Sequence, residues 1–238
     1  LMIYPKKNSI FERFFQLFVT YQLKKQFYRI HLHIEGLPKD KKILLIANHS
    51  SWWDGLVTFY LNNAVLKTDL YAMMSEQGMK DFPFFQRIGA FSVNAASPKH
   101  TVESLRFASK LLEEKKAVLI FPQGKEEHLE KRPLTFSEGP AFLLKKHSDV
   151  EVIPITYYYT FRHDQRPELF IWVGQAVFYD SSKAREEITN TLGGAVTAQL
   201  DYQKQKIIQE NDEEFTVLLK GKKTLSEWLT WWKAKVKE

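Results

Sequence analysis

Hydrophobic positions along the chain form short continuous runs separated by segments with helical spacing. One strongly helical segment lies between Val93 and Ala117, has Pro98 near its start, and carries one apolar face: Val102, Leu105, Ala108, Leu111 and Leu112. Strands that alternate with helices predict an α/β fold with a mixed, largely parallel sheet flanked by helices. The predicted strands are Ile43–Ala47, Leu70–Met73, Ala90–Val93, Ala117–Phe121, Val152–Thr156 and Leu169–Val173.

The N-terminal segment has a different pattern. Ser9 and Glu12 have the spacing of a capping box, which predicts a helix from about Ile10 to Phe27. An aromatic stripe with cations near its end suits an amphipathic helix in a membrane interface, and a helix packed on the core is the equal alternative. The stripe contains Ile10, Phe11, Phe14, Phe15, Phe18 and Tyr21.

From Ser181 onward the pattern becomes helical and charged, ending in Thr224–Lys237 with Trp228, Trp231 and Trp232. This tail is expected to consist of packed helices, although three tryptophans near a basic terminus also suit a membrane-facing surface. With no flexible linker, we expect a single domain: an N-terminal helix over 1–30 and a catalytic domain over 31–238, with a helical tail from about 181.

Composition narrows the classes of protein. The chain has no cysteine, which excludes disulfide frameworks and thiol chemistry. The lack of a signal-peptide pattern predicts cytoplasmic residence, and no apolar run reaches the length of a spanning helix. A net charge of +6 suggests an anionic partner: nucleic acid, an acidic lipid surface or a phosphorylated substrate.

The run Asn48–Asp54 follows a predicted strand and precedes the apolar segment Leu56–Leu61. Such strand-to-helix turns are where α/β folds place ligands. His49 and Asp54 can meet if the histidine lies in the turn and the aspartate in the first helical turn. An aspartate at one imidazole nitrogen fixes the tautomer and prepares the other nitrogen to accept a proton. Alone, this pair is a weak signal.

The run Phe121–Gly124 ends another predicted strand with a proline and a glycine. A sharp turn of this kind exposes backbone N–H groups, which can stabilise a developing oxyanion. An ordinary turn is the alternative.

Together, these segments resemble the glycerolipid acyltransferase superfamily, which includes the lysophosphatidic acid acyltransferases. The resemblance covers roughly Lys41 to Gly174, and the ordered set of blocks is more specific than any one of them. The four matching blocks are Asn48–Asp54, Gly89–Asn94, Phe121–Gly124 and Ile153–Ile155.

The resemblance implies an O-acyltransferase that moves a fatty acyl group from acyl-CoA or acyl-carrier protein to a lipid hydroxyl. His49 would be the general base, Asp54 its partner and the backbone near Gly124 an oxyanion donor. The resemblance implies that no acyl-enzyme is required, and nothing in the sequence calls for a metal or a redox cofactor. It also implies a peripheral or monotopic protein at the cytoplasmic face of a membrane, as in phospholipid or glycolipid synthesis, and the net positive charge favours an anionic membrane surface.

Departures from the family's blocks concern the acceptor. Related enzymes usually have Phe-Pro-Glu-Gly-Thr-Arg where this chain has Gln123, Lys125 and Glu126, and Asp-Arg where it has Asn94 and Ala95. Two arginines associated with an acceptor phosphate are therefore replaced. The pattern resembles a bacterial branch linked with acylation of glycosylated lipids, including carotenoid glycosides. The predicted acceptor-binding residues are Asn94, Gln123, Lys125 and Arg132.

Other classes fit less well. The chain contains no Gly-x-Ser-x-Gly elbow, nucleotide loop or His-Glu-x-x-His zinc motif. It also has no recognisable reader motif for nucleic acid. A non-catalytic basic membrane-binding protein, in which the His49–Asp54 pair is structural, is the remaining alternative.

Overall fold

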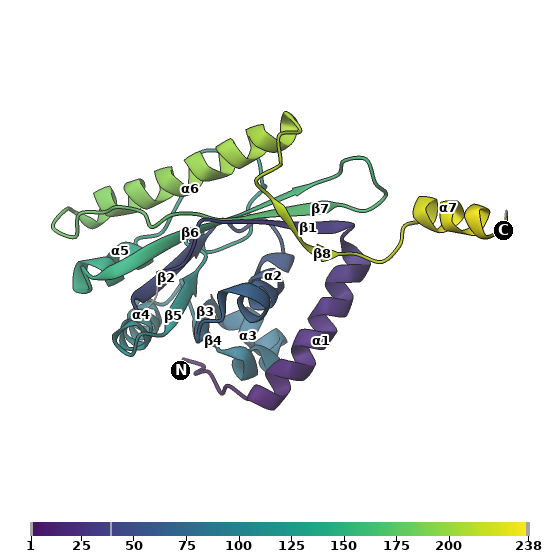
Figure 1. Cartoon of the computed structure of the whole chain (residues 1–238). Coiled ribbons are helices and arrows are strands. Elements are labelled where there is room, and N and C mark those ends of the chain that lie inside the picture. The colour runs from purple at the N-terminus through teal and green to yellow at the C-terminus, as the bar shows by residue number, and fades with distance from the viewer. Residues whose placement is uncertain (1, 39, 237–238) are drawn as a thin grey trace.

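The strands form one mixed sheet, shown in Figure 1. The structure is a computed structural model that describes residues 2–38 and 40–236, and within these residues eight strands lie in the order β4-β3-β5-β2-β6-β7-β1-β8. The predicted single α/β domain is confirmed. The strands are β1 (Arg29–Ile34), β2 (Lys42–Ala47), β3 (Leu70–Ser75), β4 (Ala90–Val93), β5 (Ala117–Ile120), β6 (Val150–Thr160), β7 (Glu168–Val173) and β8 (Thr216–Lys220).

The sheet combines parallel and antiparallel pairs. Strands β4, β3, β5, β2 and β6 all run in the same direction. Strand β7 is antiparallel to β6 and parallel to β1, and β8 is antiparallel to β1 at the edge. The carboxyl ends of the five parallel strands therefore meet at one edge, where α/β folds place their ligands.

Helices cover both faces of the sheet, and the central strand β2 is buried between them (Figure 1). Its alternate residues face opposite layers: Leu45 packs with the layer of α1 and α2, and Leu44 with the layer of α4, α5 and α6. This two-sided burial explains its continuous apolar run. The helices are α1 (Ser9–Gln26), α2 (Trp53–Leu61), α3 (Glu76–Asp81), α4 (Pro98–Glu113), α5 (Gly139–Lys146), α6 (Arg185–Ile208) and α7 (Leu225–Val236), with shorter turns η1 (Asn62–Leu66) and η2 (Pro83–Ile88).

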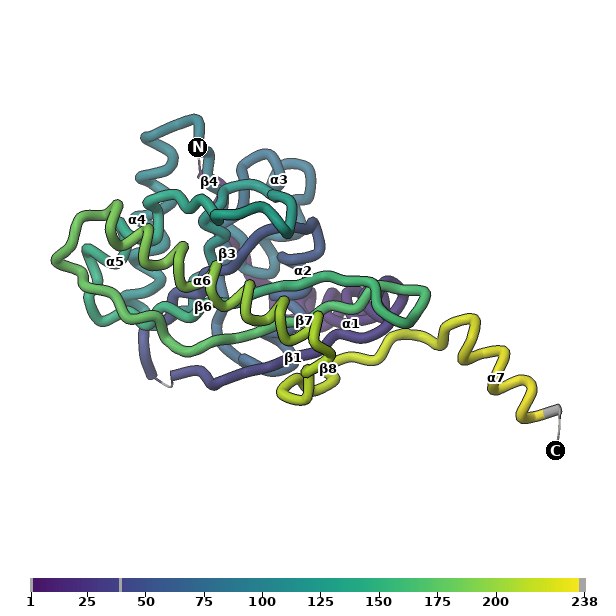
Figure 2. The backbone as a smooth tube through the Cα atoms, turned by 90° about the horizontal axis from the view of Figure 1, so that it is seen from above, coloured from purple at the N-terminus to yellow at the C-terminus, as the bar shows by residue number. Residues whose placement is uncertain are grey.

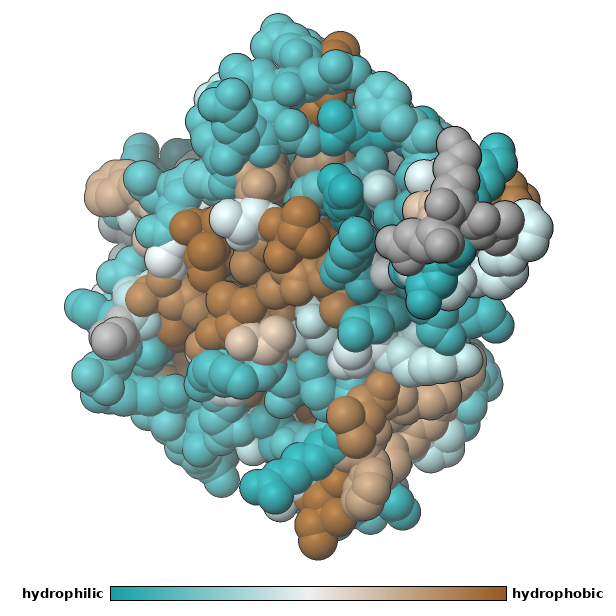
Figure 3. Space-filling model, turned by 45° about the vertical axis from the view of Figure 1, so that its right-hand side comes forward, coloured by the Kyte–Doolittle hydropathy of each residue, from teal (hydrophilic) through white to brown (hydrophobic). Residues whose placement is uncertain are grey.

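Helix α1 is partly core and partly surface. Phe15, Val19 and Leu23 are buried against the domain, which the core alternative predicts. A second apolar face remains exposed on the same helix: Ile10, Phe14, Leu17, Phe18 and Tyr21. Figure 3 turns the right-hand side of Figure 1 toward the reader. Apolar surface is gathered in patches on this face of the molecule.

Some sequence predictions were wrong in detail. Strand β1 was missed because His31 interrupts its apolar pattern; in the fold this buried ring lies 2.6 Å from the Glu168 carboxylate. Strand β8 lies within the tail that was predicted to be helical. The helix cap is Asn8, not Ser9, since the Asn8 side chain accepts from Phe11 N.

Two further details concern the other helices. Val102, assigned to the buried face of α4, is 37% exposed. The last helix was predicted to reach Lys237, which lies outside the described residues, and the described part projects from the body as α7 (Figure 2). No helix in the described parts of the chain is both long and apolar enough to cross a bilayer.

Candidate active site

The turn between β2 and α2 carries the histidine and aspartate. Asn48 holds this turn to β6: its side-chain Nδ2 donates to Tyr157 O at 3.0 Å, and Tyr157 N donates to its Oδ1 at 2.8 Å. Both bonds are buried, so the peptide that precedes His49 has a defined position. The turn then leads directly into α2, whose first turn contains Asp54.

His49 and Asp54 meet as the turn geometry predicts. His49 Nδ1 lies 2.9 Å from Asp54 Oδ2, and the aspartate side chain is fully buried. The same carboxylate accepts from Ser50 N at 2.8 Å and Ser51 N at 3.0 Å. These donors, at the start of a helix, satisfy a buried charge that would otherwise be costly. The carboxylate is therefore fixed before any substrate binds.

Tyr159 completes the surroundings of the carboxylate. Its hydroxyl donates to Asp54 Oδ1 at 2.5 Å, on the oxygen that the histidine does not use. Burial and the neighbouring Asp54 charge hold the pKa of Tyr159 well above its ordinary value, which keeps this hydroxyl a donor. Sequence reasoning missed Tyr159, although Tyr157, Tyr158 and Tyr159 form a conspicuous aromatic run at the end of a predicted strand.

The second imidazole nitrogen faces outward. With Nδ1–H assigned to Asp54, His49 Nε2 carries a lone pair that can accept a proton. The ring stacks on Phe121 with centroids 4.4 Å apart, and 20% of the side chain is exposed. Glu126 Oε1 lies 3.8 Å from Nε2, so a carboxylate borders the position of a reacting group.

Gln123 ties the β5 turn to the histidine. Its Oε1 accepts from His49 N at 2.7 Å, and its Nε2 donates to Glu127 Oε2 at 3.1 Å. In return, Glu127 N donates to His49 O at 2.9 Å. Hydrogen bonds from Lys131 and Gln123 lower the pKa of Glu127, which keeps it an acceptor. Two loops that are distant in sequence are thus held together around His49.

Gly124 has a conformational role in the structure. Its φ of +73° lies in the left-handed region that glycine adopts readily. Its N–H closes the turn by donating to Phe121 O at 3.0 Å. The Gly124 amide, which the sequence suggested as an oxyanion donor, therefore already has an acceptor within the turn. Lys125 is exposed on the same turn, beside Glu126.

Two other predicted acceptor-binding residues have partners of their own. Asn94 Nδ2 donates to Glu76 Oε2 at 2.8 Å, and its Oδ1 accepts from Ala96 N at 3.0 Å, just before α4. Arg132 Nε donates to Asp201 Oδ1 on α6 at 2.7 Å. No hydrogen bond or ion pair within the described residues joins either side chain to His49.

Aromatic side chains connect the site to α1. The ring of Phe27, at the end of α1, lies 5.7 Å from Trp53 and 6.0 Å from Tyr159. Trp52 is half exposed, and its ring lies 6.2 Å from that of Phe82. Aromatic side chains of α1 and of the β2–α2 turn therefore pack next to the His49–Asp54 pair.

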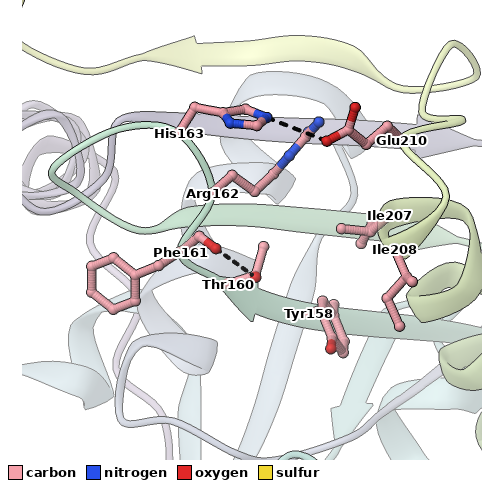
Figure 4. A pocket seen from close by; sticks show the side chains of 8 residues that line it. All are labelled: Tyr158, Thr160, Phe161, Arg162, His163, Ile207, Ile208 and Glu210. Atoms are coloured by element: carbon pink, nitrogen blue, oxygen red, sulfur yellow. Dashed lines mark hydrogen bonds and ion pairs between the residues drawn. The ribbon is translucent and has the colours of Figure 1, made fainter.

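A shallow pocket elsewhere does not include this pair. It is lined by Tyr158, Thr160, Phe161, Arg162, His163, Ile207, Ile208 and Glu210 (Figure 4). Tyr158 points to the α6 side of the sheet, whereas its neighbour Tyr157 packs on the α2 side. In the described parts of the chain, no group of three or more histidine and acidic side chains is placed to hold a metal ion.

Comparison with known proteins gives one finding. A family model described as "Acyltransferase" matches residues 29–158, more than half of the chain. This segment contains the β2–α2 turn, the β5 turn and most of β6. No curated protein matches the chain.

Proposed function

Because the chain belongs to the acyltransferase family, we propose that it is an O-acyltransferase that moves a fatty acyl group from a thioester donor to a lipid hydroxyl. The observation that carries this proposal is the His49–Asp54 pair, with its carboxylate buried and its outer nitrogen accessible. The donor is acyl-CoA or acyl-carrier protein. The protein works at the cytoplasmic face of a membrane, where both the acceptor and the exposed face of α1 would lie.

In the proposed reaction His49 Nε2 takes the proton of the acceptor hydroxyl as its oxygen attacks the thioester carbonyl. The tetrahedral intermediate then expels the thiolate, which recovers the proton from His49. One C–O bond forms and one C–S bond breaks, and no acyl-enzyme is needed. Asp54 keeps the imidazole in the required tautomer and stabilises the imidazolium between the two steps.

Glu126 supports an acceptor without a phosphate. Its carboxylate lies 3.8 Å from His49 Nε2, the nitrogen that the acceptor hydroxyl must reach. A phosphate dianion there would be repelled, and a buried phosphate normally requires arginine or several cations. A sugar ring instead supplies hydroxyl donors that a carboxylate accepts. We propose a glycosylated or other non-phosphorylated lipid acceptor, with Lys125 and Gln123 on the same turn as further contacts.

The test is acyl transfer by the purified protein from labelled acyl-CoA and from acyl-carrier protein to a panel of lipids, with products identified by mass. We expect His49→Ala to lower turnover by about two to four orders of magnitude. His128→Ala, on the exposed neighbouring loop, is the matched control and should leave turnover unchanged. Wild-type turnover in His49→Ala would remove the mechanism and favour the non-catalytic membrane-binding alternative.

The acceptor is tested separately. Specificity constants for a glycolipid and for lysophosphatidic acid, measured with one donor, should favour the glycolipid. Glu126→Arg should shift the preference toward lysophosphatidic acid, while Glu126→Gln should change it less because the charge is removed but not reversed. A clear preference of the wild-type protein for lysophosphatidic acid would show that other cations serve its phosphate.

A further inference from the structure

Helix α7 makes few contacts with the rest of the described chain: Leu225 N donates to Gln165 Oε1 at 3.0 Å, and Glu227 Oε1 lies 3.6 Å from Lys220 Nζ of β8. It projects from the body of the molecule beyond β8 (Figures 1 and 2). Over residues 225–235 every side chain is exposed except that of Glu227, which is half-buried. The exposed set includes five large apolar side chains: Leu225, Trp228, Leu229, Trp231 and Trp232. An apolar surface of this kind in water calls for a partner.

The helix is nevertheless properly capped. Thr224 Oγ1 accepts from Glu227 N at 3.3 Å, and Glu227 Oε2 accepts from Thr224 N at 3.0 Å. This reciprocal pair is a capping box, which stabilises the first turn through local contacts. The sequence therefore specifies a helix here without help from a packed core.

The arrangement of residues around α7 is that of an interfacial helix. Leu225, Trp228, Leu229 and Trp232 have i, i+3, i+4 and i+7 spacing, so they share one face. At 3.6 residues per turn, Lys233 falls on one side of this stripe and Lys235 on the other, beside Trp231. Lysines at both margins can extend their charges into a headgroup layer while the stripe enters the acyl region.

Charge points to the same partner. Between residues 220 and 236 the chain has five lysines and a single acidic residue, Glu227. Two of these lysines, Lys223 and Lys235, lie 4.7 and 5.1 Å from the centre of the Trp231 ring. Pairing two copies of this helix would bring like charges together, whereas an anionic lipid surface would neutralise them.

The base of α7 is fastened to the end of α1. Arg166 donates to the carbonyl oxygens of Lys24 and Lys25 and to that of Lys222. Gly221 N also donates to Tyr28 O at 2.8 Å. A Cβ on Gly221 would lie 2.0 Å from Phe27 O, so only glycine permits this close approach. The exposed apolar face of α1 and the stripe of α7 are thus joined at one point.

We propose that α7 is a membrane-binding helix that inserts its tryptophan stripe into an anionic lipid bilayer and acts beside the exposed face of α1. Tryptophan prefers the boundary between headgroups and acyl chains, and the flanking lysines add attraction to acidic lipids. The site lies outside the segment shared with the acyltransferase family. It depends on neither the acceptor nor the reaction, so its test is a binding measurement.

The experiment uses the full chain and flotation with two kinds of vesicle: pure phosphatidylcholine, and an equal mixture of phosphatidylcholine and phosphatidylglycerol. The variant Trp228→Ser/Trp231→Ser/Trp232→Ser should lose at least about tenfold in affinity for the anionic vesicles, since three aromatic contacts are removed. Phe178→Ser is the matched control. Phe178 is 89% exposed and belongs to the segment between β7 and α6, which lies on the side of the molecule away from α7 (Figure 1).

Thermal unfolding should be unchanged in the triple variant, which verifies an intact fold. Raised salt should weaken the wild-type binding. Wild-type affinity in the triple variant, or equal binding to both kinds of vesicle, would overturn the proposal. Sedimentation tests the remaining alternative. If the wild-type protein is a dimer, the triple variant is a monomer and both bind vesicles equally, a second copy of the chain is the partner of α7 and the membrane proposal is overturned.

Discussion

Tyr159 provides a sharp test of how the site is held. Its hydroxyl donates to Asp54 Oδ1 at 2.5 Å and contacts Asp54 rather than the outer nitrogen of His49. Tyr159→Phe removes this single donor and preserves the ring that packs against Phe27. Asp54 keeps its bonds from His49, Ser50 and Ser51, so the change loosens the carboxylate without releasing it.

The size of the effect follows from that geometry. A hydrogen bond to a charged group contributes about 1.5–3 kcal/mol, and the loss leaves one oxygen of a buried carboxylate without its donor. We therefore expect the free energy of unfolding to fall by about 2 kcal/mol. A loosened Asp54 positions the imidazole less well, and a barrier raised by about 1.4 kcal/mol lowers kcat about tenfold.

The assay compares Tyr159→Phe with Tyr158→Phe by steady-state kinetics and urea unfolding. Tyr158 precedes Tyr159 in β6, faces the other side of the sheet and donates to Glu130 Oε1 at 2.9 Å, so Tyr158→Phe loses a similar bond that does not involve Asp54. Only Tyr159→Phe should lower kcat, with KM for the donor unchanged. Equal kcat values in the two variants would refute a positioning role for Tyr159.

Three further predictions follow from the described contacts. Asp54→Asn should lower kcat more than Tyr159→Phe does, since it alters the partner of His49 itself; steady-state kinetics would measure this, and similar losses would contradict it. Phe14→Ser with Phe18→Ser should weaken binding to anionic vesicles while the melting temperature is kept, because both rings are exposed; a lower melting temperature with unchanged binding would assign them to the core. Burial and Glu130 raise the pKa of Tyr158 to about 12 from an ordinary 10.0, so its folded form stays protonated longer than its unfolded form. The contribution of Tyr158 to the free energy of unfolding should be fully present below about pH 10 and should fall by up to about 1.4 kcal/mol per pH unit between pH 10 and 12. Denaturant titrations should show a smaller fall in Tyr158→Phe.

The sequence predicted the strands best where burial is continuous. Strand β2 lies between two helical layers, so its apolar run is unbroken and its bounds were found to within one residue. Strand β1 was missed because His31 interrupts its apolar pattern, and β8 was missed because it lies at the sheet edge, where fewer positions need to be apolar. The buried His31–Glu168 contact joins residues 137 positions apart, and no local sequence pattern predicts such a pair.

The site was predictable only in its local part. His49 and Asp54 lie five residues apart, and the turn between a strand and a helix brings them together. Tyr159 reaches Asp54 from 105 residues away, and Gln123 reaches His49 from 74, so both depend on the order of strands in the sheet. A strand order cannot be read from apolar periodicity, and these two contacts therefore required the fold.

The position of β1 has a consequence for how the chain folds during synthesis. Its neighbours β7 and β8 follow it by more than a hundred residues, and both lie outside the segment 29–158 that the family model matches. A ribosome-bound chain that has completed β6 would still present β1 with both edges unpaired. Such distant pairing slows folding and leaves an edge open to aggregation until the last strand emerges. A chain ended at residue 158 would remain in that condition, and it would also lack the tyrosine that completes the surroundings of Asp54.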